Sequence, residues 1–136
     1  AIVAALGAPL KWALCGRPPD DRWQGKGRVS LLGDAAHPML PFLAQGAAMA
    51  LEDGYVLARE LAARPQDPVG ALRRYEKTRA PRTARVQQGA FDNARTFHLD
   101  GYRASSRNMA LALMNALPGL FLKRYDWLYG GDVTAT

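Results

Sequence analysis

The sequence contains a single cysteine, Cys15, and only two histidines. One cysteine cannot form a disulfide within the chain, which fits a reducing, cytoplasmic compartment. Because Cys15 follows the apolar stretch from Trp12 to Leu14, we expect a buried small hydrophobe rather than a nucleophile. No stretch approaches the roughly 20 apolar residues that a membrane helix requires. The opening run Ala1–Leu10 also lacks the basic leader of a signal peptide, and its start at Ala1 suggests a processed or excised chain.

Basic residues are in excess, and the excess is local. The formal net charge is +6, and the short run Arg73–Arg85 holds several of the 18 Lys and Arg residues. One interpretation is a solvated helix face on which Glu76 pairs with Lys77 or Arg79. The other is a nucleic-acid-binding surface. Because Tyr75 is the lone aromatic residue in the run, we favour the solvated face and expect no nucleic-acid partner.

Two short segments have the residues typical of β-strands. In Lys11–Cys15, Trp12 and Leu14 alternate with polar or small neighbours, and Arg28–Leu32 is an apolar run bounded by glycines. Two strands alone do not form a stable sheet. We therefore expect Arg28–Leu32 to be a central strand whose neighbours lie elsewhere in a larger α/β protein or in another chain.

Three long helices are predicted, over about 45–64, from 68 onward and over about 105–117. Asp67 is a good N-cap for the second, and Pro81 should kink that helix or end it early. Helical spacing gives the first helix the apolar positions Leu51, Tyr55, Ala58 and Leu61. It gives the second helix the apolar positions Leu72, Tyr75, Val86 and Ala90.

The segment Gly33–Asp53 carries the residues best suited to chemistry. It follows an expected strand, and ligands of open α/β sheets bind at the carboxyl ends of strands. Asp34 stands at such an end, and an ionised carboxylate accepts hydrogen bonds from the hydroxyl groups of a ligand. The next helix opens with small residues, whose backbone N–H groups are free to face a flat ligand. The alternative is tight packing of a strand–loop–helix unit, with Asp34 as a helix or turn cap.

The sequence GDAAHPMLPFLAQGAAMALEDG, Gly33–Gly54, resembles the second FAD fingerprint of the class A flavoprotein aromatic hydroxylases. This family includes salicylate, para-hydroxybenzoate and 3-hydroxybenzoate hydroxylases, and the resemblance extends over roughly Leu10–Asn93. It implies a mainly α fragment with a few short strands, taken from an α/β, Rossmann-like FAD-binding parent fold. Residues 1–27 would end the substrate-binding domain, 28–64 would complete the FAD-binding domain, and 65–136 would form a C-terminal helical region.

The resemblance also assigns cofactor-binding residues. Gly33 and Asp34 would hold the ribityl chain of FAD, with Asp34 binding its hydroxyl groups. Gly46, Ala47 and Ala48 would offer backbone N–H groups to the pyrimidine end of the isoalloxazine ring. A helix start is a sensible partner for this ring, because the reduced flavin is negatively charged there.

Two residues are implied at the substrate side of the ring. Pro41 would lie beside the substrate, and Gln45 would face the substrate phenol, as in the 3-hydroxybenzoate 6-hydroxylase branch. Leu43 replaces a glycine that is common in other branches, so the loop geometry is left open there. We expect His37 to be structural rather than a catalytic base, and Glu52 and Asp53 to cap or pair on the helix surface.

The implied parent is an FAD-dependent, NAD(P)H-using monooxygenase that hydroxylates a phenolic acid of the salicylate or 3-hydroxybenzoate type through C4a-hydroperoxyflavin. The family's N-terminal Gly-x-Gly-x-x-Gly is absent, so we expect this chain to be inactive without the remainder of the parent enzyme. The alternatives are a related flavoprotein epoxidase or decarboxylating hydroxylase, or a non-enzymatic basic helical module. No metal site and no membrane contact are expected, and a homodimer is one option for the assembly.

Overall fold

The computed structural model describes residues 8, 10–20, 22–25, 27–115, 118–123 and 125–135. Most of the run Ala1–Leu10, and with it the expectation about a signal peptide, lies outside this part. The elements in chain order are η1 (Gly33–Ala35), η2 (Pro41–Leu43), α2 (Gly46–Ala63), α3 (Pro68–Phe97), α4 (Gly101–Asn115), α5 (Pro118–Lys123) and α6 (Asp126–Tyr129). The η elements are short 3₁₀ turns, and α4 begins earlier than the sequence predicts.

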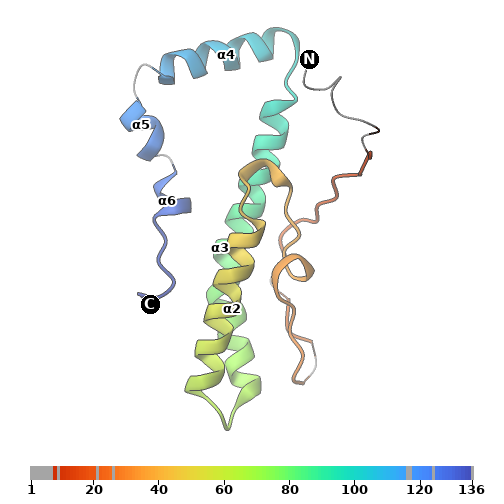
Figure 1. The fold of residues 1–136 in the computed structure, drawn as a ribbon, viewed down its shortest axis with the longest axis vertical. Coiled ribbons are helices and arrows are strands. Elements are labelled where there is room, and N and C mark those ends of the chain that lie inside the picture. The colour runs from red at the N-terminus through yellow and green to blue at the C-terminus, as the bar shows by residue number, and fades with distance from the viewer. Residues whose placement is uncertain are drawn as a thin grey trace.

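Helices α2 and α3 form a long antiparallel pair (Figure 1), and their starts agree with the predicted ones. Asp67 caps α3 by accepting a hydrogen bond from the Gly70 N–H at 2.9 Å. Pro68 occupies the first turn, where its missing N–H leaves no partner unsatisfied. Of the two outcomes expected at Pro81, an early end does not occur, and α3 continues to Phe97. Proline has no N–H to bond to the backbone carbonyl four residues earlier in the helix. Pro81 is exposed, so that carbonyl is close to water.

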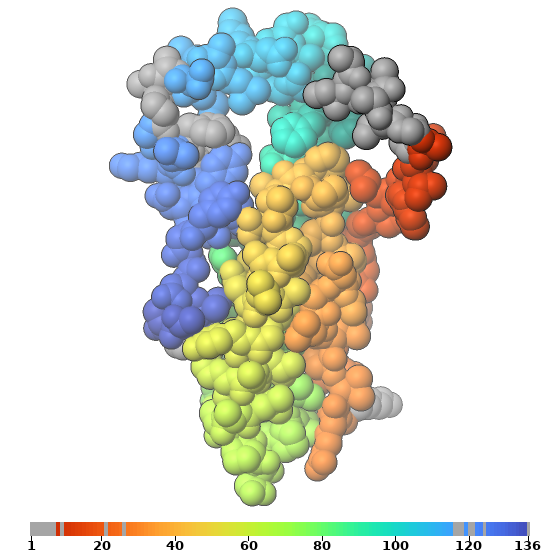
Figure 2. Space-filling view, in the orientation of Figure 1, coloured from red at the N-terminus to blue at the C-terminus, as the bar shows by residue number. Residues whose placement is uncertain are grey.

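The segments before and after this pair lie along its two flanks. The chain that precedes α2 runs along one side, α4 crosses beyond one end of the pair, and α5 and α6 return along the other side (Figure 1). The space-filling view shows the C-terminal segment and the segment before α2 covering opposite flanks of the pair (Figure 2). The helix pair is therefore the frame that positions both η turns and the C-terminal segment.

The predicted strands are not formed, so the expectation of a few short strands is wrong for the described residues. Lys11–Cys15 has no regular structure, and Trp12 is 79% exposed. Arg28–Leu32 contributes a single isolated bridge, from Ser30 to Gln24. A strand is stabilised by a continuous row of backbone hydrogen bonds to its neighbours. Arg28–Leu32 has two such bonds, to Trp23 and Gly25, and for Lys11–Cys15 the described residues show none.

The core lies between α2 and α3, and only one of the two predicted apolar faces is buried there. The predicted face of α3 is 8% exposed or less at every position, namely Leu72, Tyr75, Val86 and Ala90. The predicted face of α2 is wrong, since Leu51 is 76% exposed and Tyr55 is 44% exposed. The buried residues of α2 are Met49, Asp53 and Val56. Spacing marks the residues that seek burial, but no described element covers the Leu51 face.

Cys15 is exposed, so the prediction of a buried small hydrophobe is wrong. The cause is the same as for its segment, because Lys11–Cys15 has no neighbour in the described chain to pack against. Among the described helices, none combines the length and the apolar character needed to cross a membrane.

Candidate functional site

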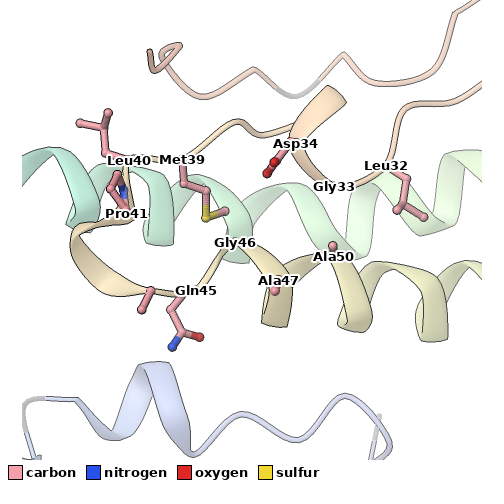
Figure 3. A pocket seen from close by; sticks show the side chains of 11 residues that line it. Leu32, Gly33, Asp34, Met39, Leu40, Pro41, Gln45, Gly46, Ala47 and Ala50 are labelled. Carbon is pink, nitrogen blue, oxygen red and sulfur yellow. The ribbon is translucent and has the colours of Figure 1, made fainter. Parts of the chain in front are cut away.

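An open cavity of about 620 Å³ lies at the start of α2 (Figure 3). This volume is typical of small-molecule sites. Its walls come from the η1 turn, the η2 loop and the first turn of α2. The lining residues are Leu32, Gly33, Asp34, Met39, Leu40, Pro41, Ala44, Gln45, Gly46, Ala47 and Ala50. The fold thus brings together all the predicted site residues except Ala48, which packs against the apolar cluster around Met49 instead.

The η1 turn places Asp34 at the cavity. Gly33 is buried, its φ of 59° is left-handed, and a Cβ there would lie 3.3 Å from the Ala50 Cβ, so the position favours glycine. Asp34 follows it and is exposed, with Oδ1 only 3.8 Å from the point where a Cβ on Gly46 would stand. None of the described residues forms a hydrogen bond with the Asp34 carboxylate. The alternative of a capping Asp34 is therefore not observed, and this carboxylate is available to a ligand.

The first turn of α2 has unpaired donors, and two of the residues that carry them, Gly46 and Ala47, line the same cavity. The helical ladder begins with the bond from the Met49 N–H to the Gln45 carbonyl at 2.9 Å. Within the described chain the N–H groups of Gly46, Ala47 and Ala48 have no backbone acceptor, and Gln45 provides no side-chain cap. These donors and the helix dipole make this end of α2 favourable for a carbonyl oxygen or a negative charge.

The two residues predicted at the substrate side lie on the η2 loop. Pro41 opens this turn, and Ala44 closes it in a left-handed conformation with a φ of 52°. Gln45 is half-buried, and Figure 3 shows its amide pointing away from Asp34. Met39 and Leu40 form an apolar wall that the sequence analysis did not single out. Their position between two prolines of a predicted loop was the available signal.

A buried polar cluster, made of His37, Asp53 and Arg79, lies behind the η1 turn. Asp53 is fully buried and accepts hydrogen bonds from the Gly33 N–H at 3.1 Å, from His37 Nε2 at 2.5 Å and from Arg79 Nε at 2.8 Å. Because a carboxylate only accepts, His37 must carry its proton on Nε2. Burial alone would raise the pKa of Asp53, but the hydrogen bonds from His37, Arg79 and Gly33 outweigh it and hold this pKa below its ordinary value.

This cluster corrects one expectation and supports another. Asp53 does pair, as predicted, but it lies in the interior and not on the helix surface. His37 is 1% exposed, bonds to Asp53 and does not line the cavity, in agreement with a structural role. Sequence analysis missed Arg79, although it falls on the buried face of α3, one turn after Tyr75. A charged residue on an apolar stripe is the signal that could have identified it.

A second ion pair links the same helices to the C-terminal segment. Glu52 accepts hydrogen bonds from Arg79 Nη1 at 2.6 Å and from Arg82 Nε at 2.7 Å. Burial would raise the pKa of Glu52, but the bonds and charges of Arg82 and Arg79 hold it below its ordinary value. Arg82 also donates to the backbone carbonyls of Trp127 and Leu128, both at 3.1 Å. The guanidinium group thereby ties the α6 region to α2.

These contacts also show how part of the basic run Arg73–Arg85 is engaged. The solvated-face interpretation expected Glu76 to pair with Lys77 or Arg79, and it does not. Glu76 instead accepts hydrogen bonds from the Trp23 and Gln24 N–H groups at 3.1 and 2.5 Å. Two arginines of the basic run, Arg79 and Arg82, are paired with carboxylates of α2. Another, Arg85, lies 4.0 Å from the centre of the Trp127 ring. Part of the run is therefore occupied with contacts inside the molecule.

Comparison with known proteins identifies the family. Residues 20–90 match the family described as FAD binding domain. The chain is 46% identical over 123 residues to 3-hydroxybenzoate 6-hydroxylase 1 of Aquipseudomonas alcaligenes, covering 90% of this chain and 30% of that protein. It is 42% identical over 130 residues to a 3-amino-4-hydroxybenzoate 2-monooxygenase of Streptomyces platensis, covering 95% of this chain and 31% of that protein.

A third relative, the 6-hydroxynicotinate 3-monooxygenase of Bordetella bronchiseptica, is 47% identical over 94 residues, covering 68% of this chain and 24% of that protein. The chain therefore spans only about 24 to 31% of the length of these three relatives. The family match, by contrast, extends over more than half of the 136 residues, including both η turns and α2. On this evidence the chain belongs to the FAD binding domain family.

Proposed function

We propose that this chain is the C-terminal part of an FAD-dependent, NAD(P)H-using monooxygenase that hydroxylates a phenolic aromatic acid. The observation that carries the proposal is the cavity at the start of α2, which is lined by the unengaged carboxylate of Asp34 and by Gly46 and Ala47, whose backbone N–H groups are unpaired. Membership of the FAD binding domain family supports FAD as the occupant.

The residues present fit a flavin. The Asp34 carboxylate suits the hydroxyl groups of the ribityl chain, and Gly33 holds the turn that presents it. The N–H groups of Gly46, Ala47 and Ala48 suit the carbonyl-rich pyrimidine edge of the ring. Gly46 also keeps the helix backbone open to close approach, because no side chain projects there. When bound, FAD would accept a hydride from NAD(P)H and activate oxygen for transfer to the aromatic ring.

The substrate we propose is a benzoate or a related ring acid that carries a hydroxyl group, of the salicylate or 3-hydroxybenzoate type. The names of the relatives support this class, because each describes an enzyme acting on a hydroxylated aromatic acid. On this chain Pro41 and Gln45 would lie beside the substrate, with Met39 and Leu40 as an apolar wall that excludes water from the reacting ring. Gln45 would orient the phenolic hydroxyl by hydrogen bonding.

The remainder of the parent polypeptide would complete the site and cover the apolar surfaces that this chain leaves exposed. These surfaces are the row Leu10, Trp12 and Leu14, the segment from Val29 to Leu32, and the Leu51 face of α2. Each contains large apolar side chains that remain exposed in the described part of the chain. The short alignment to the relatives supports a polypeptide that extends well beyond these residues. By this argument the isolated chain is inactive.

The test uses the full-length protein that contains this segment. After purification, any released flavin is identified, and NADH and NADPH oxidation is followed with salicylate, 3-hydroxybenzoate and 4-hydroxybenzoate. We expect bound FAD and hydroxybenzoate-stimulated oxidation that yields a hydroxylated product. Asp34→Ala should lower FAD affinity, whereas the matched control Asp92→Ala, an exposed acid far along α3, should not. Wild-type protein that binds no flavin would refute the proposal. An epoxidised or decarboxylated product would identify the enzyme as an epoxidase or a decarboxylating hydroxylase instead.

A further inference from the structure

We propose that Asp53, together with Arg79 and His37, is a positioning residue that sets the place of Asp34 and thereby the affinity for the cofactor. This inference rests on the proposed flavin site. None of the three residues lines the cavity, so each would act through the η1 turn and not by touching the ligand.

The link between the cluster and the turn is one hydrogen bond. The Gly33 N–H donates to Asp53 Oδ2 at 3.1 Å, and Gly33 is the residue immediately before Asp34. Gly33 is also the residue with the left-handed φ of 59°, so its peptide orientation decides which way the next side chain points. A carboxylate fixed in front of this N–H therefore fixes the direction of Asp34 toward the start of α2.

Asp53 is itself held from two further directions. His37 Nε2 donates to the same oxygen at 2.5 Å, and Arg79 Nε donates to the other oxygen at 2.8 Å. The donors come from the loop after η1 and from α3, while Asp53 belongs to α2. One carboxylate thus connects the η1 turn to both long helices. Each donor therefore has an acceptor oxygen. No other amino acid with a side chain of this length would provide two acceptor oxygens at position 53.

An asparagine at position 53 would keep the side-chain volume but could not accept all three hydrogen bonds. Its NH₂ group would face either Arg79 Nε–H or the pair formed by Gly33 N–H and His37 Nε2–H. Two donors directed at each other lose a buried hydrogen bond and repel. The Gly33 peptide is the least anchored of the three partners, because it lies in a short 3₁₀ turn. We therefore expect Asp53→Asn to move the turn before it moves α3.

A matched control separates this role from general stability. Arg82→Gln breaks the half-buried pair with Glu52, which also joins α2 to α3. Among the described residues Arg82 forms no hydrogen bond with the η1 turn or with Asp53. Both changes should lower the unfolding midpoint. Only Asp53→Asn should also change cofactor binding. A role limited to stability would weaken FAD binding equally in both variants.

The experiment titrates FAD into the full-length apoprotein of wild type, Asp34→Ala, Asp53→Asn and Arg82→Gln, and records the visible circular dichroism of the bound flavin. We expect Asp53→Asn to raise the Kd for FAD about tenfold or more, by analogy with the residues that orient metal ligands through hydrogen bonds. We also expect it to alter the flavin spectrum, while Arg82→Gln leaves both near wild type. If wild type binds FAD and Asp34→Ala weakens it, but Asp53→Asn does not, the inference is wrong and the proposed function stands.

A wild-type protein that does not bind FAD would instead overturn the proposed function itself. Should Asp53→Asn fail to fold, two variants of His37 test the positioning role instead. His37→Gln keeps a donor near the position of Nε2, and His37→Phe removes the donor but keeps a ring. The inference requires His37→Phe to weaken FAD binding and His37→Gln to restore most of it. Equal FAD affinity in these two variants would contradict it.

Discussion

Replacing Arg79 with methionine should be among the most destabilising single changes in this chain. The Arg79 side chain is 1% exposed, and it contacts Asp53 at 2.8 Å, Glu52 at 2.6 Å and the Met49 carbonyl at 3.4 Å. Methionine retains most of the volume but leaves the buried Asp53 carboxylate without its cationic partner. Breaking a buried ion pair by removing one partner typically costs about 3–5 kcal/mol.

Arg82 provides the internal comparison. It binds the same Glu52, but it is 21% exposed and Glu52 is 16% exposed, so water compensates part of the loss. We expect Arg82→Met to cost about 1–2 kcal/mol, between exposed and fully buried pairs. Urea denaturation of the full-length proteins measures both through the midpoint and slope. If Arg79→Met costs less than Arg82→Met, or less than about 1 kcal/mol, the argument for a buried charged cluster is refuted.

Three further predictions concern the same framework. Gly33→Ala should cost about 1–2 kcal/mol and weaken FAD binding, because the residue has a φ of 59° and its Cβ would lie 3.3 Å from that of Ala50; thermal unfolding and FAD titration measure the two effects. Leu128→Ala, which truncates a 2% exposed side chain, should cost about 2–5 kcal/mol and speed proteolysis of the C-terminal segment. The lowered pKa of Asp53 gives stability that is complete above its ordinary pKa of 3.8 and lost as pH falls through the lower folded value; the stability difference between wild type and Asp53→Asn should therefore shrink below about pH 4 in an acid titration.

Local sequence signals predicted the two long helices well. The Asp67 cap and the small residues after Gln45 act within one turn, so they do not depend on the rest of the protein. The predicted strands failed because a strand needs partners along its length, and Arg28–Leu32 has only one isolated bridge, to the nearby Gln24. The predicted burial of the Leu51 face of α2 was wrong for the same reason, because burial depends on which element lies opposite that face.

The fold brings most of the predicted site residues together, and their roles stay predictions. Resemblance to a fingerprint identified Asp34 and Gly46, which the structure places across one cavity. The supporting cluster was not foreseen, because Asp53 is stabilised by donors that are distant in sequence, His37 and Arg79. A buried carboxylate cannot be told from a surface one until its partners are known.

A crystal structure of the full-length protein with FAD would show whether the cavity at the start of α2 holds the flavin. We expect density for the ring against the N–H groups of Gly46 and Ala47, with a ribityl hydroxyl within hydrogen-bond distance of Asp34. A flavin bound elsewhere, with Asp34 facing solvent and the start of α2 covered by protein, would contradict it.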